Sequence, residues 1–211
     1  MFTTKQVSVR NQIYDLQWVA EDAWCFIIIE TEWQRFHKDV LRHVTDDKMV
    51  VQAGGNCGLY PFYYSFLFDK VVTFEPEPLN FACLAQNCKS NQFIKFNTAV
   101  GDKCGFVSIG NPDPDRDNVG MYTVGGGDIE VYTMTIDSLQ LEDCSLIHLD
   151  VEGYEYNVLK GAINTIKKHK PVLALEISRD QQEIDKMLTK MGYKCVEQYG
   201  VENNNFVYKV E

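Results

Sequence analysis

Apolar and polar positions follow two alternating rhythms from residue 49 onward. Short apolar runs of strand length alternate with longer segments whose apolar residues recur every three or four positions, as in amphipathic helices. The predicted strands are 49–53, 70–74, 93–100, 145–149 and 171–177, and the predicted helices are 58–68, 79–90, 154–168 and 181–191. This order predicts an α/β domain built on a mostly parallel sheet.

Two later segments depart from this rhythm. Residues 101–140 contain turn-forming stretches at 111–115 and 125–127 beside short strand-like pieces, so we expect a small β insertion with a long loop. Near the end of the chain, segments 193–198 and 206–210 are joined by too few residues for a crossover helix. They must therefore pair antiparallel, which predicts a reversed hairpin strand at the end of the sheet.

The first 48 residues follow neither rhythm. We expect them to form an N-terminal adjunct of strand and helix to one domain at 49–211, which carries the insertion at 101–140. Residues 32–44 place apolar side chains at helical spacing. This helix either packs over the sheet or acts as a lid over a ligand cleft, and the sequence does not choose between the two.

Charge and cysteine usage narrow the class of protein. The chain has 20 Lys and Arg against 30 Asp and Glu, a formal charge of −10, which argues against a nucleic-acid partner because phosphates require a basic surface. Seven scattered cysteines without a Cys-x-x-Cys pair indicate reduced thiols and a cytoplasmic setting. The longest early apolar run covers only seven residues, so we expect neither export nor a membrane span.

A glycine-rich turn follows the first strand of the α/β rhythm. Gly54, Gly55 and Gly58 lie between that strand and the next helix, an arrangement that lets a nucleotide-type ligand approach the backbone. Glu75 ends the following strand, 20 residues after Gly55, which is the spacing at which a strand-end acid can hold a ribose. Together these residues predict a cofactor site.

A second cluster of chemically active residues ends the strand at 145–149. Alternation along a strand would place His148 and Asp150 on one face, with Glu152 on the same side as the chain turns into the next helix. These three titratable groups should then meet at the carboxyl edge of the sheet, beside the glycine turn. For Glu155 we favour a structural role at the helix N-terminus.

Five sequence blocks resemble the FkbM-type methyltransferases. They are VQAGGNCG at 51–58, FEPEP at 74–78, TIDSL at 135–139, LDVEGYE at 149–155 with VLKGA at 158–162, and LE at 175–176. The resemblance implies the Rossmann-like class I fold, with a seven-stranded, mostly parallel sheet and an antiparallel C-terminal hairpin strand. It also implies S-adenosylmethionine as cofactor and a hydroxyl of a saccharide or other small metabolite as methyl acceptor.

Cofactor contacts follow from the resemblance by position. Gly54, Asn56 and Gly58 are expected against the methionine part, together with Gly55 and Gln52. Glu75 is expected to hold the ribose. Asn97 and Ala99, after the third strand, would border the adenine, and Asp150 would lie near the methyl group.

The titratable residues at this edge suggest roles in catalysis, because a hydroxyl acceptor must lose its proton. Asp150 would orient the acceptor, and His148 or Glu152 would assist its deprotonation. His148 stands where the family frequently has lysine. Gln52 stands where the family usually has aspartate; it can hydrogen-bond the cofactor but carries no charge.

The sequence leaves several alternatives open. Asp150, Glu152, Glu176 and His148 could hold a divalent ion, although we predict no metal. The chain could be a catalytically silent S-adenosylmethionine-binding module or a partner-binding protein. A nicotinamide-dependent oxidoreductase is a third possibility, against which the reversed C-terminal hairpin counts. The loop at 111–127, with Met121 and Tyr122, is expected to border the acceptor.

Overall fold

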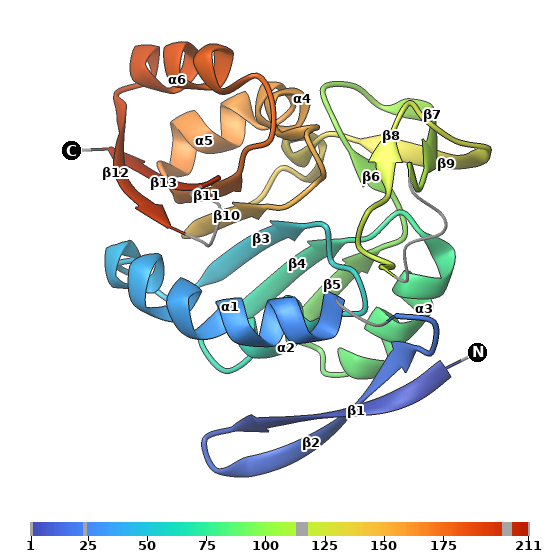
Figure 1. Cartoon of the computed structure of the whole chain (residues 1–211). Helices are drawn as coiled ribbons and strands as arrows, with labels where there is room; N and C mark the ends of the chain where they lie inside the picture. The colour runs from blue at the N-terminus through green and yellow to red at the C-terminus, as the bar shows by residue number, and fades with distance from the viewer. Residues whose placement is uncertain (1, 23–24, 113–117, 200–203, 211) are drawn as a thin grey trace.

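The central element of the structure, a computed structural model, is a seven-stranded sheet (Figure 1). The described residues are 2–22, 25–112, 118–199 and 204–210. In spatial order the strands are β12 (Tyr193–Tyr199), β13 (Asn205–Val210), β11 (Val172–Glu176), β10 (Leu146–Leu149), β3 (Met49–Ala53), β4 (Lys70–Phe74) and β5 (Phe93–Phe96). Only β13 runs antiparallel to its neighbours. The predicted mostly parallel sheet with a reversed hairpin strand is confirmed.

Helices cover both faces of this sheet (Figure 1). They are α1 (Cys25–Asp39), α2 (Leu59–Tyr64), α3 (Pro78–Asn87), α4 (Glu155–Lys160), α5 (Ile163–His169) and α6 (Gln181–Lys190), with 3-10 turns η1 (Leu41–His43) and η2 (Ile136–Leu139). Alternation along the strands divides the core, since Val51 and Val72 face the layer of α4, α5 and α6. Val50 and Val71 face α1 and α2.

The predicted helix at 154–168 is two helices in the structure, α4 and α5. They separate at Gly161, where an added Cβ would lie 2.0 Å from the carbonyl oxygen of Gly101. The helical segment must therefore change direction where it presses against another backbone. The predicted strand at 93–100 also divides, because its last two residues leave the main sheet.

The segment after β5 forms a separate four-stranded sheet. In spatial order it contains β6 (Ala99–Val100), β9 (Ile129–Met134), β7 (Gly105–Gly110) and β8 (Thr123–Val124). This small sheet stands beside the carboxyl end of the main one (Figure 1). It brings the loop that precedes β8 over the ends of the central strands.

The N-terminal residues form a hairpin that the sequence pattern did not reveal. Strands β1 (Phe2–Val9) and β2 (Gln12–Val19) pair antiparallel, and β2 docks on α3, because the Gln17 backbone and the Asn87 side chain exchange hydrogen bonds of 2.7 and 2.8 Å. Phe36 of helix α1 and Val40, the residue after that helix, are buried against the sheet, so this part of the helix packs on it. Within the described residues, no helix is both long and apolar enough to span a membrane.

Candidate functional site

The glycine turn at the end of β3 is held by the neighbouring strand and by the end of β10. The amides of Gly54 and Gly55 donate to the carbonyl oxygen of Phe74, at 3.1 and 2.8 Å. Gly54 has a φ of +85°, and an added Cβ would lie 1.7 Å from the carbonyl oxygen of Asp150. Only glycine permits both this conformation and this approach, so the turn brings the ends of three strands together.

Glu75 holds the next residue of this turn from the end of β4. Its Oε2 accepts a hydrogen bond from the Asn56 amide at 2.7 Å, and its Oε1 accepts one from the Glu77 amide at 2.9 Å. The side chain is buried, and burial raises its pKa to about 7 against the opposing effect of these amides. A carboxylate offers about four acceptor positions, so further donors can still reach it.

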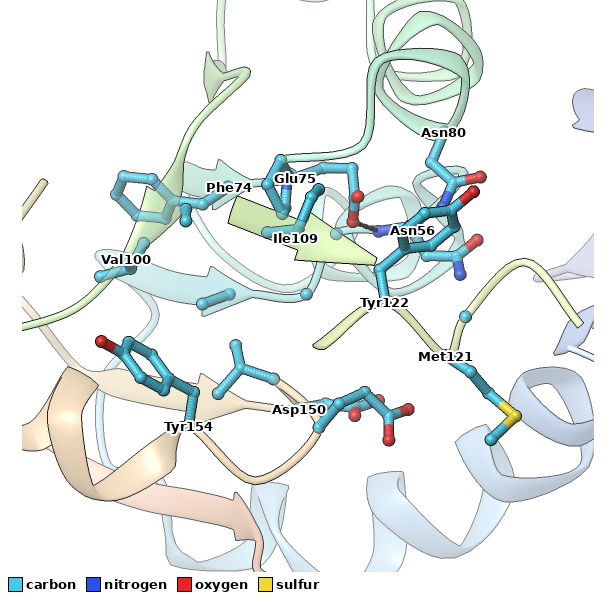
Figure 2. A pocket seen from close by; sticks show the side chains of 18 of the residues that line it. Asn56, Phe74, Glu75, Asn80, Val100, Ile109, Met121, Tyr122, Asp150 and Tyr154 are labelled. Carbon is cyan, nitrogen blue, oxygen red and sulfur yellow. Dashed lines mark hydrogen bonds between the residues drawn. The ribbon is translucent and has the colours of Figure 1, made fainter. Parts of the chain in front are cut away.

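A cavity of about 560 Å³ opens between these strand ends. Figure 2 shows Glu75 and Asn56 on one side, Asp150 on the opposite side, and Tyr122 and Met121 on the loop that crosses the cavity. The residues predicted for cofactor binding or catalysis that line it are Gly54, Gly55, Asn56, Glu75, Ala99, Asp150 and Glu152. The volume is within the usual range for small-molecule and cofactor sites.

Three predicted cofactor contacts lie behind the cavity lining. Gln52 is fully buried between strands; its Nε2 donates to the Gly54 carbonyl oxygen, and its Oε1 accepts from the Thr73 hydroxyl, both at 2.7 Å. Gly58 caps the start of α2 against Leu84. Asn97 donates to the Glu75 carbonyl oxygen at 2.8 Å. The structure thus gives these three residues a part in supporting the turn and the strand end, and none of them lines the cavity.

His148 is the clearest departure from the prediction. Its side chain is 3% exposed, and its Nδ1 lies 2.8 Å from the Tyr64 hydroxyl oxygen. The rings of Phe36 and Tyr60 pack against it, with centroids 4.7 and 4.8 Å away. Burial lowers its pKa to about 3. As an enclosed neutral histidine that does not line the cavity, His148 is unsuited to the predicted role of base.

The chain after β10 brings acids to the cavity as predicted. Burial and the nearby carboxylates of Glu176 and Glu155 raise the pKa of Glu152 to about 7, while the Arg179 guanidinium opposes the shift. Oε1 of Glu155 accepts from the Val151 amide at 3.2 Å and the Gly153 amide at 3.1 Å. Glu155 therefore shapes the turn, which agrees with the structural role expected for it.

Cys25, Asn80 and Asn204 are among the cavity residues that the sequence did not predict. The Asn80 side-chain amide donates to the Val119 carbonyl oxygen at 2.8 Å and so ties the crossing loop to α3. The Asn204 side-chain amide donates to Glu176 Oε1 at 2.8 Å. These residues come from three distant parts of the chain, and no local motif marks them. Among the described residues, no group of three or more His, Cys, Asp or Glu has a metal-binding arrangement.

Comparisons with known proteins agree with this architecture. The sequence-family model of the Methyltransferase FkbM domain matches residues 52–195 of this chain. A curated relative, hexuronic acid methyltransferase AglP of Haloferax volcanii, is 24% identical over 177 residues, which are 77% of this chain and 73% of the relative.

Solved structures share the fold at low sequence identity. The crystal structure of Methyltransferase FkbM from Methylobacillus flagellatus KT has a TM-score of 0.58 and 17% identity, over 86% of this chain and 51% of the other. This chain thus spans about half the length of that protein. A ribosomal protein L11 methylase from Lactobacillus delbrueckii subsp. bulgaricus has a TM-score of 0.52 and 10% identity, over 86% and 80% of the two chains. The fold is the Rossmann-like fold of class I methyltransferases, and the family match shows that this chain belongs to the FkbM methyltransferases.

Proposed function

We propose that this protein uses S-adenosylmethionine to methylate a hydroxyl group of a saccharide or other small metabolite. The observation that carries the proposal is the cavity that brings the glycine turn, Glu75 and Asp150 together at the carboxyl ends of β3, β4 and β10. In open α/β sheets this edge is where ligands bind. Membership of the FkbM methyltransferases supports the reaction class.

The residues present fit the cofactor. Thr98 lines the cavity, and its buried hydroxyl oxygen has no hydrogen-bond partner among the described residues. A ligand with polar ring atoms would satisfy it, in keeping with the expected adenine position beside Ala99. Glu75 would receive the ribose hydroxyls, and the acids at the opposite side would favour a sulfonium cation.

The sulfonium supplies an already activated methyl group, so the protein mainly has to position the acceptor and remove its proton. Positioning can contribute roughly 7 to 11 kcal/mol of the barrier. Because His148 is enclosed behind Tyr60, we assign the removal of the acceptor proton to Glu152. Its pKa of about 7 suits a base near neutral pH. Asp150 would orient the acceptor hydroxyl from the end of β10.

The acceptor assignment rests on the family and on the lining. Tyr154, Tyr122 and Tyr60 line the cavity and offer faces on which a sugar ring could stack. The curated relative is a hexuronic acid methyltransferase, which supports a saccharide as the acceptor class.

A methyl-transfer assay tests the proposal. Purified protein, S-adenosylmethionine and a panel of sugars, glycosides and polyols would be incubated, and methylated products would be identified by mass spectrometry. We expect a methyl ether on at least one sugar and its loss in Asp150→Asn. Cofactor binding without transfer to any member of this panel, or of further panels of lipids and peptides, would contradict the enzyme and favour the silent binding module.

A further inference from the structure

The charge of the cavity distinguishes one kind of acceptor from another. Four carboxylates line it, those of Glu75, Asp150, Glu152 and Glu176, and the described lining residues include no Lys, Arg or His. This charge pattern is independent of the family resemblance, which says nothing about the charge of the acceptor. Its interpretation rests on the proposed function, since it concerns the acceptor of that reaction.

Three of these acids come from the ends of two adjacent strands. Asp150 and Glu152 follow β10, and Glu176 ends the adjacent strand β11. The proximity of Glu176 is one cause of the raised pKa of Glu152, so their carboxylates interact. Asn204 donates to Glu176 Oε1 and fixes that carboxylate at the cavity wall.

The Arg179 guanidinium acts on Glu152 from outside the cavity lining, where it opposes the rise in the pKa of that acid. Arg179 is exposed and does not line the cavity. Its Nη2 donates to the backbone carbonyl oxygen of Glu152 at 3.2 Å, and its guanidinium lies against Gly153. Arg179 therefore supports the backbone of the turn that carries Glu152, outside the cavity lining.

A carboxylate on the acceptor would have to approach these acids in a partly enclosed site. The cofactor brings one net positive charge, from a sulfonium and an ammonium against one carboxylate, and this offsets only part of the acidic lining. Like charges placed together disfavour binding strongly, whereas an ammonium group would be attracted.

We infer that the acidic side of the cavity, formed by Asp150, Glu152 and Glu176, selects a neutral or amino sugar and rejects a uronic acid. This acceptor differs in charge from the hexuronic acid named for the curated relative. Glu176 is the residue that determines this specificity, because its carboxylate lies near the proposed base, Glu152, and has no role in removing the proton of the acceptor.

Matched acceptor pairs test this inference in the full-length protein. The rates of methyl transfer to the p-nitrophenyl glucoside, glucosaminide and glucuronide, and to the galactoside and galacturonide, would be compared at saturating S-adenosylmethionine. We expect kcat/KM for the neutral and amino sugars to exceed that for the matched uronides by at least ~10-fold. In Glu176→Gln the ratio should fall by at least ~3-fold, because one repelling charge is removed.

Two control variants and a binding measurement separate the possible failures. Arg179→Gln should leave the neutral sugar preferred over the uronide, as should Arg116→Gln, whose residue lies outside the described part of the chain. The inference would be overturned if a uronide were methylated as fast as its neutral partner. It would also be overturned if either arginine variant abolished methyl transfer to the uronide. Both outcomes would leave the proposed function intact. Transfer to no sugar and to no other small hydroxyl metabolite, with calorimetry showing the cofactor bound, would contradict the proposed function itself and the inference with it.

Discussion

Two regions beside the end of β10 place polar side chains in opposite environments. In the aromatic region, His148 is surrounded by Phe36 and Tyr60, and its ring nitrogen is satisfied by the Tyr64 hydroxyl. In the acidic region, Asp150 and Glu152 face a cavity. The two regions are only two residues apart along the chain, yet one is part of the core and the other is part of the site.

The difference comes from what covers each region. Helices α1 and α2 pack over the His148 side of the sheet and supply a cluster of apolar and aromatic partners. Beyond β10 the chain meets the glycine turn, where the backbones approach closely and side chains are absent. The presence of a titratable side chain near a strand end is therefore insufficient to assign catalysis, since the neighbours decide whether it reaches a ligand.

Gly54→Ala is expected to have the largest effect on the acidic region. Its Cβ would overlap the Asp150 carbonyl oxygen at 1.7 Å, so we expect a loss of more than about 4 kcal/mol in unfolding free energy, or no folded protein. Gly192→Ala is a matched control with a φ of +86° and nothing within 4 Å of the added Cβ. It should lose only about 1–2 kcal/mol from backbone strain. Equal losses in chemical denaturation would contradict the close approach.

Glu152→Gln tests the chemistry of the acidic region. We expect a fall in kcat of roughly 10² to 10⁴-fold without loss of folding, because a positioned base typically contributes that much. In the parent, activity should decline as pH falls, since burial and neighbouring acids raise the pKa of Glu152 to about 7 and a protonated base is inactive.

The pH profile sharpens this test. At saturating cofactor the acidic limb should lie between 4.5, the ordinary value for glutamate, and about 7, because the sulfonium partly reverses the shift. The limb should be absent from the residual activity of Glu152→Gln. If kcat of Glu152→Gln were within a few-fold of the parent value and its pH profile kept the acidic limb, another group would be the base.

Tyr64→Phe tests the aromatic region and should have the smallest effect. Removal of the hydroxyl leaves His148 Nδ1 without its 2.8 Å partner in the core, which should lower the unfolding free energy by about 1–3 kcal/mol. Cofactor affinity and the pH profile should not change, because this pair does not line the cavity. A shift in either would show that the two regions are coupled.

The strength of the sequence pattern explains which features could be predicted. The apolar strands, the reversed hairpin and the glycine turn with Glu75 are local signals, and the structure has each of them. The N-terminal hairpin lacked such a signal, because half of the residues of β1 are exposed and polar residues recur along it. It buries Val7 and Leu16 against residues around α2 and α3, a contact made only by the folded chain.

The residues of the site also divide into those with a local sequence signal and those without one. Gly54, Glu75 and Asp150 lie at strand ends, where topology alone brings them together. His148 was misassigned because alternation fixes the face of a strand but not the helix that covers it. Asn80 and Asn204 were missed because their cavity positions depend on loops that meet only in three dimensions.

A calorimetric titration with S-adenosylmethionine, S-adenosylhomocysteine and NAD tests the central claim most directly, that the cavity beside Glu75 is a methyl-donor site. We predict micromolar binding of the first two ligands, no comparable binding of NAD, and at least ~10-fold weaker binding in Glu75→Ala. Glu130→Gln, an exposed acid on β9, should bind as the parent does. Tighter binding of NAD, no binding by the folded parent, or unchanged affinity in Glu75→Ala would contradict the account.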